Sequence, residues 1–165
     1  MYPQLKQFGK VKLNESLAKH TTFKIGGQAR FFVIVEDREK TIELLNFLSG
    51  EGIGYFILGG GSNLLLPDNG FDGVVVKIKI EKIKDKNNEI EAESGVPLGA
   101  LLALTLKNNL TGMEWAAGVP GTIGGAVRGN AGAFGSDMGS NVSRVEVWRD
   151  GEVVNLSKEE CNFAY

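Results

Sequence analysis

The sequence predicts an α+β fold made of two lobes, and three observations support this prediction. A strand, a helix and a second strand follow one another in the first half of the chain, which is typical of a small parallel α/β lobe. Alternating strands, tight-turn signals and helices fill the second half. Each half also contains one glycine-rich loop. We therefore expect an N-terminal α/β lobe over residues 1–78 and an antiparallel lobe with helices over residues 79–165.

In the first lobe, residues 30–35 form a short apolar run with aromatic and β-branched side chains, which predicts a strand. Asp37 is placed to cap the helix that follows, where apolar residues recur at helical spacing over residues 42–48. Glycines then end this helix, and residues 55–58 form a second strand. A strand, a helix and a strand in this order predict a parallel pair with a right-handed crossover.

In the second lobe, residues 74–84 and 89–93 are expected to form an antiparallel pair around a turn at Asn87–Asn88, because asparagine tolerates the positive φ of a tight turn. Pro97 suits the first turn of a helix that ends at Asn108–Asn109. The inner face of this helix is expected to contain Leu98, Leu101, Leu102, Thr105 and Leu106.

The last part of the chain predicts a hairpin followed by a helix. Residues 142–148 alternate as in a strand, Asp150–Gly151 is a strong turn signal, and residues 153–156 return. Ser157, with Glu160 three residues later, resembles a capping box. A domain does not usually stop a few residues into a helix, so we expect the natural polypeptide to be longer.

Composition and charge exclude several classes of function. Hydrophobic residues make up 42% of the chain, the net charge is −2, and no apolar run is long enough to span a membrane. The densest group of lysines, within residues 77–86, alternates with apolar residues, which indicates a solvated strand face and not a nucleic-acid interface. Cys161 is the single cysteine, so no internal disulfide forms and we expect a structural thiol. We expect a cytoplasmic protein without a metal, a nucleic-acid partner or a membrane partner.

The two glycine-rich loops, residues 58–65 and residues 118–133, present backbone with almost no charged side chains. Successive backbone N–H groups form a nest for an anion, and glycine lets the backbone approach it closely. Ser62, Asn63 and Thr122 add side-chain donors. Both loops together therefore predict a site for a diphosphate-bearing cofactor.

Neither loop is a standard nucleotide motif. A Walker A loop requires a lysine that is absent here, and the dinucleotide fingerprint begins at Gly59 but meets Leu64 where its third glycine belongs. Residues 121–127 are expected to open a short helix whose N-terminus faces the anion. We interpret the two loops as walls of one site in a cleft between the lobes.

Three blocks carry a resemblance to a known family: residues 20–27 (HTTFKIGG), residues 58–65 (LGGGSNLL) and residues 118–135 (GVPGTIGGAVRGNAGAFG). With these blocks, the chain resembles the N-terminal, FAD-binding part of the UDP-N-acetylenolpyruvoylglucosamine reductases, over essentially its whole length. The resemblance implies a fold of the vanillyl-alcohol-oxidase or PCMH type, in which two α+β lobes sandwich FAD.

The resemblance also implies which residues hold the cofactor. In the first lobe these are Ile25, Gly26, Gly27, Leu58, Gly59, Gly60, Gly61, Ser62, Asn63 and Leu64. In the second lobe they are Val119, Pro120, Gly121, Thr122, Gly124, Gly125, Asn130, Ala131 and Gly132. His20 is expected to lie at the surface or to stabilise a turn, and Trp115 and Trp148 are expected to be core or lobe-packing residues.

The family reaction implied is the reduction of UDP-N-acetylglucosamine enolpyruvate to UDP-N-acetylmuramate, with NADPH as the hydride donor, in peptidoglycan precursor synthesis. The family's catalytic Arg, Ser and Glu have no counterpart in this chain, because residues 157–165 resemble the segment that leads into a Tyr-Arg pair and stop at the Tyr. We therefore expect a chain that binds FAD without turnover, with no catalytic residue and without the C-terminal substrate domain.

Two alternatives remain open from the sequence alone. The chain is a candidate for the flavin-binding subunit of a multi-subunit molybdenum hydroxylase, although the first block and residues 157–165 argue against it. A non-catalytic nucleotide-binding module is the other alternative, and it predicts that a mononucleotide such as ADP binds as well as FAD.

Overall fold

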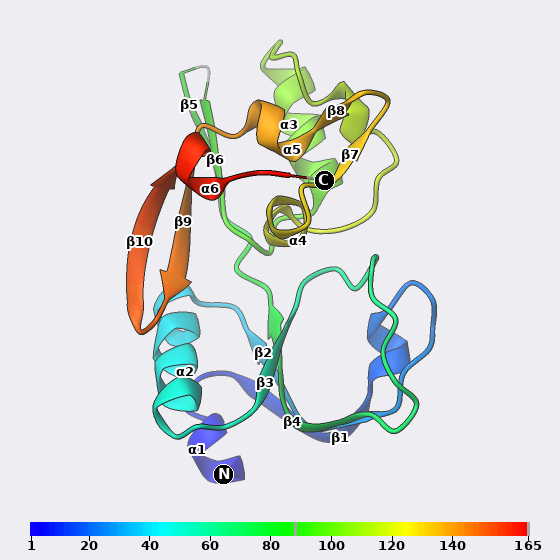
Figure 1. The fold of residues 1–165 in the computed structure, drawn as a ribbon, viewed down its shortest axis with the longest axis vertical. Coiled ribbons are helices and arrows are strands. Elements are labelled where there is room, and N and C mark those ends of the chain that lie inside the picture. The colour runs from blue at the N-terminus through cyan, green and yellow to red at the C-terminus, as the bar shows by residue number, and fades with distance from the viewer. Residues whose placement is uncertain (88, 165) are drawn as a thin grey trace. The chain divides into compact units, whose positions relative to one another are not determined.

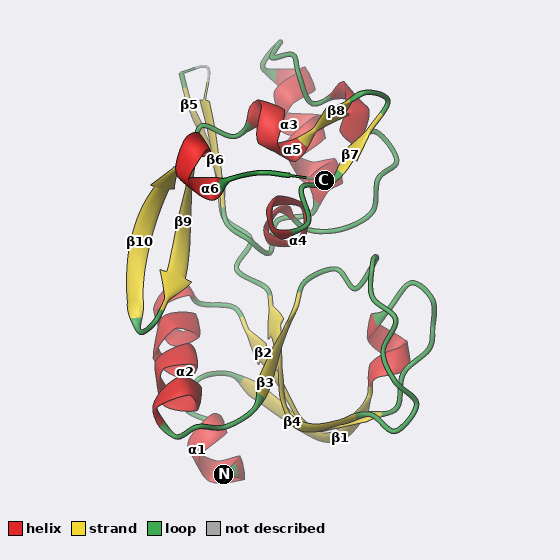
Figure 2. Cartoon of the chain, in the orientation of Figure 1, coloured by secondary structure: helices red, strands yellow, loops and turns green. Residues whose placement is uncertain are grey.

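The computed structural model describes residues 1–87 and 89–164. The chain divides into two compact units, unit 1 (Met1–Ile80) and unit 2 (Glu81–Tyr165), and each is described by itself. The fold mixes parallel and antiparallel strands with helices, as the α+β prediction requires (Figures 1 and 2).

Unit 1 is built on a four-stranded sheet of order β1-β2-β4-β3. Its strands are β1 (Lys10–Ser16), β2 (Gln28–Val35), β3 (Tyr55–Leu58) and β4 (Phe71–Ile78), and its helices are α1 (Tyr2–Leu5), the 3₁₀ helix η1 (Leu17–His20) and α2 (Arg38–Gly50). Strand β1 runs antiparallel to β2, whereas β2 and β3 both run parallel to β4. Figure 2 shows the long loop that leaves β3 and returns to β4.

Helix α2 begins and ends as the sequence predicts. The Asp37 side chain accepts a hydrogen bond from the amide of Lys40 at 2.9 Å, which confirms the predicted cap. Leu44 and Leu48 on its inner face are fully buried. The helix ends at Gly50, where the glycines stop it.

The two faces of the sheet pack against different partners (Figure 1). Side chains alternate between the faces along each strand. Helices α1 and α2 cover the face that carries Val33, Val35, Val74, Val76 and Ile78. Residues of η1 and of the loop after β3 cover the face that carries Phe32, Leu58 and Val75. The second face therefore lies next to two of the sequence blocks singled out above.

The predicted pairing of the first two strands was wrong in one respect. Strands β2 and β3 are parallel, but β4 lies between them. Residues 73–76 of β4 are all buried, as expected of a central strand with both faces covered. The predicted strand over residues 74–84 is therefore divided: its first part belongs to this sheet, and only residues 83–86 form a hairpin.

The described residues of unit 2 form three two-stranded pairs and several short helices. The strands are β5 (Ile83–Lys86), β6 (Glu89–Ala92), β7 (Gly132–Ala133), β8 (Ser136–Asp137), β9 (Arg144–Arg149) and β10 (Glu152–Ser157). The helices are α3 (Leu98–Lys107), η2 (Glu114–Ala116), α4 (Ile123–Arg128), α5 (Met138–Asn141) and α6 (Lys158–Cys161). Strand β5 pairs with β6, β7 with β8, and β9 with β10, all antiparallel.

Most turn predictions in unit 2 are confirmed. Asn87 has a φ of 50°, while Asn88 lies outside the described residues. Asp150 and Gly151 both have positive φ between β9 and β10, and Ser157 and Glu160 form the capping box.

The predicted inner face of α3 is correct except at its end. Leu98, Leu101 and Thr105 are buried, and Leu102 packs partly against them. Leu106 is 62% exposed, because it lies at the edge of the apolar stripe next to the last residue of the helix. Trp115 is 4% exposed in the same core, as predicted. None of the helices in the described part of the chain has the length and apolarity that a membrane span requires.

Candidate cofactor site

The first glycine-rich loop begins where β3 ends. Leu58 is fully buried and pairs in register with Lys77 of the parallel strand β4. Ligands of open α/β sheets bind outside the carboxyl ends of parallel strands, and residues 59–64 lie at that end of β3. The topology of unit 1 therefore presents this loop where a ligand is expected.

Gly61 holds the loop against the backbone of the first block. Its φ is 73°, and an added Cβ would lie 2.0 Å from the carbonyl oxygen of His20. The amide of Thr22 donates a hydrogen bond to the Gly61 carbonyl oxygen at 3.0 Å. Only glycine fits here, because the position combines left-handed backbone with direct contact between two main chains.

The Ile25–Gly27 turn is bound to the segment that directly follows this loop. The Gly27 amide donates to Pro67 O at 2.9 Å, and the Leu17 amide donates to Gly27 O at 2.8 Å. Gly26, with a φ of 134°, fits between the side chains of Leu17 and Leu66. The structure therefore brings two of the three sequence blocks together within unit 1.

A hollow of about 380 Å³ lies beside this turn. It is lined by Ile25, Leu65, Leu66, Pro67 and Asp68. Two apolar side chains at the hollow, Ile25 and Leu65, are 44% and 73% exposed. An apolar surface thus borders the glycine loop.

Several amides of the first loop have no internal partner. Within the part of the chain that the structure describes, the N–H groups of Gly60, Gly61, Asn63 and Leu64 donate no hydrogen bond. Gly61 is nevertheless buried. Buried backbone N–H groups are almost always paired in folded proteins, so the unpaired amide of Gly61 indicates a ligand acceptor at this loop. The more exposed amides of Gly60, Asn63 and Leu64 are open to the same ligand.

The side chains of this loop divide into core and surface. Leu58 and Leu64 pack in the core of unit 1, so they offer a ligand their backbone only. Gly59 and Ser62 are half-buried, whereas Gly60 and Asn63 are exposed.

Lys77 is a residue at this loop that we did not predict as part of the site. Its ammonium group donates a hydrogen bond to the Gly59 carbonyl oxygen. Lys77 lies two residues after Val75 and therefore on the same face of the sheet as the loop. The signal in the sequence is a single charged residue within the apolar run of β4, which we interpreted as part of a solvated face.

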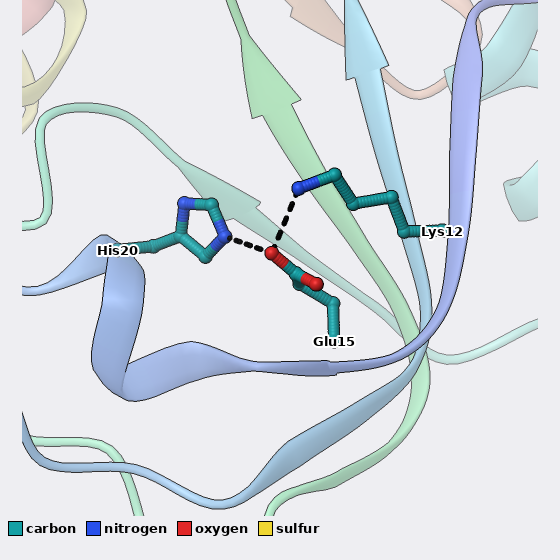
Figure 3. Close-up of polar contacts among 3 residues, drawn as sticks. All are labelled: Lys12, Glu15 and His20. Carbon is teal, nitrogen blue, oxygen red and sulfur yellow. Dashed lines mark hydrogen bonds and ion pairs between the residues drawn. The ribbon is translucent and has the colours of Figure 1, made fainter.

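A polar cluster of Lys12, Glu15 and His20 supports the first block (Figure 3). Lys12 Nζ lies 2.8 Å and His20 Nε2 lies 3.0 Å from Glu15 Oε1. The His20 ring stacks on Phe32 with a centroid distance of 4.2 Å, so it helps to hold η1 against strand β2. Hydrogen bonds from Lys12 and then from His20 lower the pKa of Glu15 from 4.5 to about 2.

We expect Glu15→Gln to lower the free energy of unfolding by about 1–3 kcal/mol near neutral pH, because two donors lose a charged acceptor. The folded-state pKa of Glu15 is lowered, so this contribution is complete above pH 4.5 and is lost as the pH falls toward about 2. Urea unfolding at a series of pH values measures this contribution. The free energies of unfolding of wild type and variant should converge in acid.

Glu43→Gln is the matched control. Glu43 is also paired with a lysine three residues away, Lys40, but its side chain is 51% exposed compared with 14% for Glu15. Exposed pairs of this kind contribute about 0.5 kcal/mol or less. Equal effects of the two substitutions at every pH would contradict the role given to Glu15.

In unit 2, the second glycine-rich loop is fastened to the segment before α3. Pro97 and Thr122 form an isolated β-bridge, in which the Leu98 amide donates to Gly121 O at 3.1 Å. Gly121 has a φ of 136°. An added Cβ on Gly124 would lie 2.7 Å from Cβ of Ser94, so Gly124 permits a close approach of the two segments.

We predicted that the N-terminal amides of a short helix over residues 121–127 face an anion. For two of these amides the prediction was wrong. Helix α4 begins at Ile123, but the Ile123 amide donates to Val96 O at 2.9 Å and the Gly124 amide donates to Ser94 O at 2.8 Å. These groups are used to fasten the loop and are not available to a ligand. No sequence pattern predicts this use of the two amides, because the acceptors are carbonyl oxygens of another segment.

Thr122 carries an unpaired donor at the same place. Its Oγ1 is buried and has no hydrogen-bond partner among the described residues, and although Thr122 is the N-cap of α4 its side chain makes no capping bond. A buried hydroxyl without a partner costs about 1–3 kcal/mol. This atom therefore fits a polar ligand group at the loop.

Asn130 shapes the end of the second loop. Its Nδ2 donates to Asp137 at 3.0 Å, and its Oδ1 accepts from the Gly139 amide at 2.8 Å. Hydrogen bonds from Ser140 and from Asn130 lower the pKa of Asp137. The Asn130 carboxamide is thus occupied within unit 2, and the residue holds the β7–β8 hairpin in position.

The other predicted residues of the second loop divide by exposure. Val119 and Ala131 pack partly against the core of unit 2. Pro120, Gly125 and Gly132 are exposed. The convergence of both loops on one site stays a prediction.

Comparison with known proteins agrees with this geometry. Residues 29–157 match the model of the FAD binding domain family. The chain is 42% identical over 157 residues to the UDP-N-acetylenolpyruvoylglucosamine reductase of Clostridium tetani, covering 94% of this chain and 51% of that protein. It is also 42% identical over 159 residues to the reductase of the same name from Caldanaerobacter subterraneus, covering 95% of this chain and 53% of that protein. The chain spans about half the length of the curated relatives it matches.

Solved structures give the same result for the fold. The UDP-N-acetylenolpyruvylglucosamine reductase of Thermus caldophilus superposes with a TM-score of 0.75 at 29% identity, over 94% of this chain and 55% of that one. Alkyldihydroxyacetonephosphate synthase superposes with a TM-score of 0.70 at 15% identity, over 96% of this chain and 35% of that one, and shows the fold alone. The predicted PCMH-type fold and the predicted resemblance are confirmed, and the chain belongs to the FAD binding domain family.

Proposed function

We propose that this chain is the FAD-binding part of an NADPH-dependent reductase that converts UDP-N-acetylglucosamine enolpyruvate to UDP-N-acetylmuramate. The names of the most similar curated relatives support the reaction. The match of residues 29–157 to the FAD binding domain family supports the cofactor. FAD, when bound, supplies the two-electron carrier between a hydride donor and the substrate.

The observation that carries this proposal is the row of unpaired amides in the first loop. A diphosphate offers several charged oxygen acceptors, and each N–H bonded to such an oxygen contributes about 1.5–3 kcal/mol. Gly60, Gly61, Asn63 and Leu64 provide such donors without any internal competitor among the described residues. We assign the diphosphate of FAD to residues 59–64.

The remaining predicted residues are assigned from the family resemblance and from their exposure. We propose that the Ile25–Gly27 turn, with its apolar border, lies next to a ring of the cofactor. We propose that Thr122 Oγ1 donates to a phosphate or ribityl oxygen, because it has no partner among the described residues. Residues 119–121, Gly125 and residues 130–132 are proposed to line the same cofactor.

FAD binding by the purified chain tests this proposal. We expect the protein to take up FAD stoichiometrically, with a shift of the visible flavin absorbance and quenching of flavin fluorescence in an equilibrium titration. A colourless protein that rejects added FAD would contradict the proposal. ADP in the same titration is the control, because a non-catalytic mononucleotide module would bind ADP as tightly as FAD.

The substrate and partner assignments form the second part of the proposal. We propose that the UDP-sugar and the catalytic Arg, Ser and Glu belong to a C-terminal substrate domain, so this chain alone should not oxidise NADPH when the UDP-sugar is added. Measuring NADPH absorbance with the FAD-loaded chain checks this. We propose a cytoplasmic location, because the cell makes nucleotide-sugar precursors and NADPH there.

A further inference from the structure

The contact between Lys77 and the first glycine loop has a consequence for ligand binding. Lys77 Nζ donates to the carbonyl oxygen of Gly59, the first residue after β3. Because Leu58 pairs with Lys77, the lysine lies next to the end of β3 and reaches one residue along the loop. Lys77 is half-buried, and its hydrogen bond to Gly59 holds the ammonium group close to the backbone.

Peptide geometry links this contact to the amide of Gly60. In a trans peptide the C=O of one residue and the N–H of the next point in opposite directions. Holding the Gly59 carbonyl toward Lys77 therefore turns the Gly60 N–H away from it. Among the described residues this N–H has no acceptor.

The same arrangement recurs two residues later. The Thr22 amide holds the Gly61 carbonyl oxygen at 3.0 Å, and an added Cβ on Gly61 would meet the adjacent backbone of His20 and Thr21. Fixing this carbonyl likewise sets the direction of the next amide, that of Ser62. The carbonyl oxygens of Gly59 and Gly61, which would repel an anion, are thus bound within the protein. The Gly60 amide, which follows the first of them, is left to face a ligand.

We propose that Lys77 is a positioning residue that orients the Gly59–Gly60 peptide so that the loop selects an anionic ligand. This inference rests on the proposed function, because it takes the diphosphate of FAD as the ligand of residues 59–64. Lys77 acts through the peptide that it holds. Its role is therefore distinct from simple charge attraction, which salt would screen.

Substitution of Lys77 by methionine tests the proposal in the full chain. We expect Lys77→Met to weaken binding of FAD and of ADP by about tenfold, the effect of one hydrogen bond to a charged group. Riboflavin, which has no phosphate, should bind unchanged. The tenfold ratio should persist from low to high salt, and Lys77→Arg, which keeps a donor for the carbonyl, should restore most of the affinity.

Lys79→Met is the matched control, because Lys79 lies two residues after Lys77 and is exposed. This substitution should leave the affinities for FAD, ADP and riboflavin unchanged. Equal FAD affinities of wild type and Lys77→Met would overturn the proposal, as would a difference that disappears at high salt. A parallel loss of riboflavin binding together with a lower melting temperature would overturn it in favour of a structural role. Failure of the wild-type chain to bind FAD would instead count against the proposed function.

Discussion

Replacing Gly61 with alanine should lower the free energy of unfolding by about 3 kcal/mol or more and weaken FAD binding by more than about 100-fold. The new Cβ would lie 2.0 Å from the His20 carbonyl oxygen, at a residue whose φ is 73°. The loop must move away from the first block, which breaks the hydrogen bond from Thr22 and turns the amides that face the proposed diphosphate. Thermal unfolding and a flavin titration measure the two effects.

Gly52→Ala separates backbone strain from the close contact. Gly52 also lies in unit 1 and has a φ of 63°, but an added Cβ there would meet nothing within 4 Å. Alanine at residue 52 should cost only the left-handed strain, about 1–2 kcal/mol, and should leave FAD binding unchanged. If the two variants were equally stable, the contact with His20 would not restrict residue 61.

The local elements of the fold could be predicted because their signals lie within a few residues. Asp37 bonds to an amide three residues later, and Ser157 and Glu160 form a reciprocal pair at the same spacing. The hairpin at Asp150–Gly151 depends on two adjacent residues with positive φ. In each case one short stretch of sequence contains both partners of the interaction.

The pairing of distant strands could not be predicted in the same way. Strand β4 enters between β2 and β3, and β1 adds an antiparallel edge that we did not expect. The β1 residues are mostly exposed or half-buried, so the strand has no clear apolar alternation and is defined by its partner β2. A run of buried residues at 73–76 marks a central strand, but its neighbours are set by packing over the whole unit.

At the candidate site, the residue types could be predicted from the sequence, but their contacts could not. The sequence indicates that glycine is needed at residues 27 and 61 so that two backbone segments can approach closely. It does not indicate that the neighbouring backbone belongs to residues 68 and 20. The Gly124 amide donates to the Ser94 carbonyl oxygen, and Lys77 donates to the Gly59 carbonyl oxygen. In both cases the two partners lie far apart in the sequence. Sequence patterns therefore located the loops, whereas the structure decides which of their polar groups remain for a ligand.

Thr122→Val should change stability and cofactor affinity in opposite directions. Valine keeps the shape and the β-branch but removes a buried hydroxyl that has no partner among the described residues and makes no capping bond. The chain without FAD should therefore gain about 1–3 kcal/mol in the free energy of unfolding. FAD binding should weaken by about 10-fold to 100-fold, since one donor to a charged oxygen is lost.

Thr105→Val provides the opposite control in the same unit. Thr105 is also buried, but its Oγ1 donates to Leu102 O at 2.7 Å, so its hydroxyl is already satisfied. Removing it should lower stability by about 1 kcal/mol and leave FAD affinity unchanged, because Leu102 loses a donor and the ligand loses nothing. Chemical unfolding without FAD, followed by flavin titration of each variant, compares the two. A Thr122→Val protein less stable than wild type, with unchanged affinity, would show that the hydroxyl serves the fold and not the cofactor.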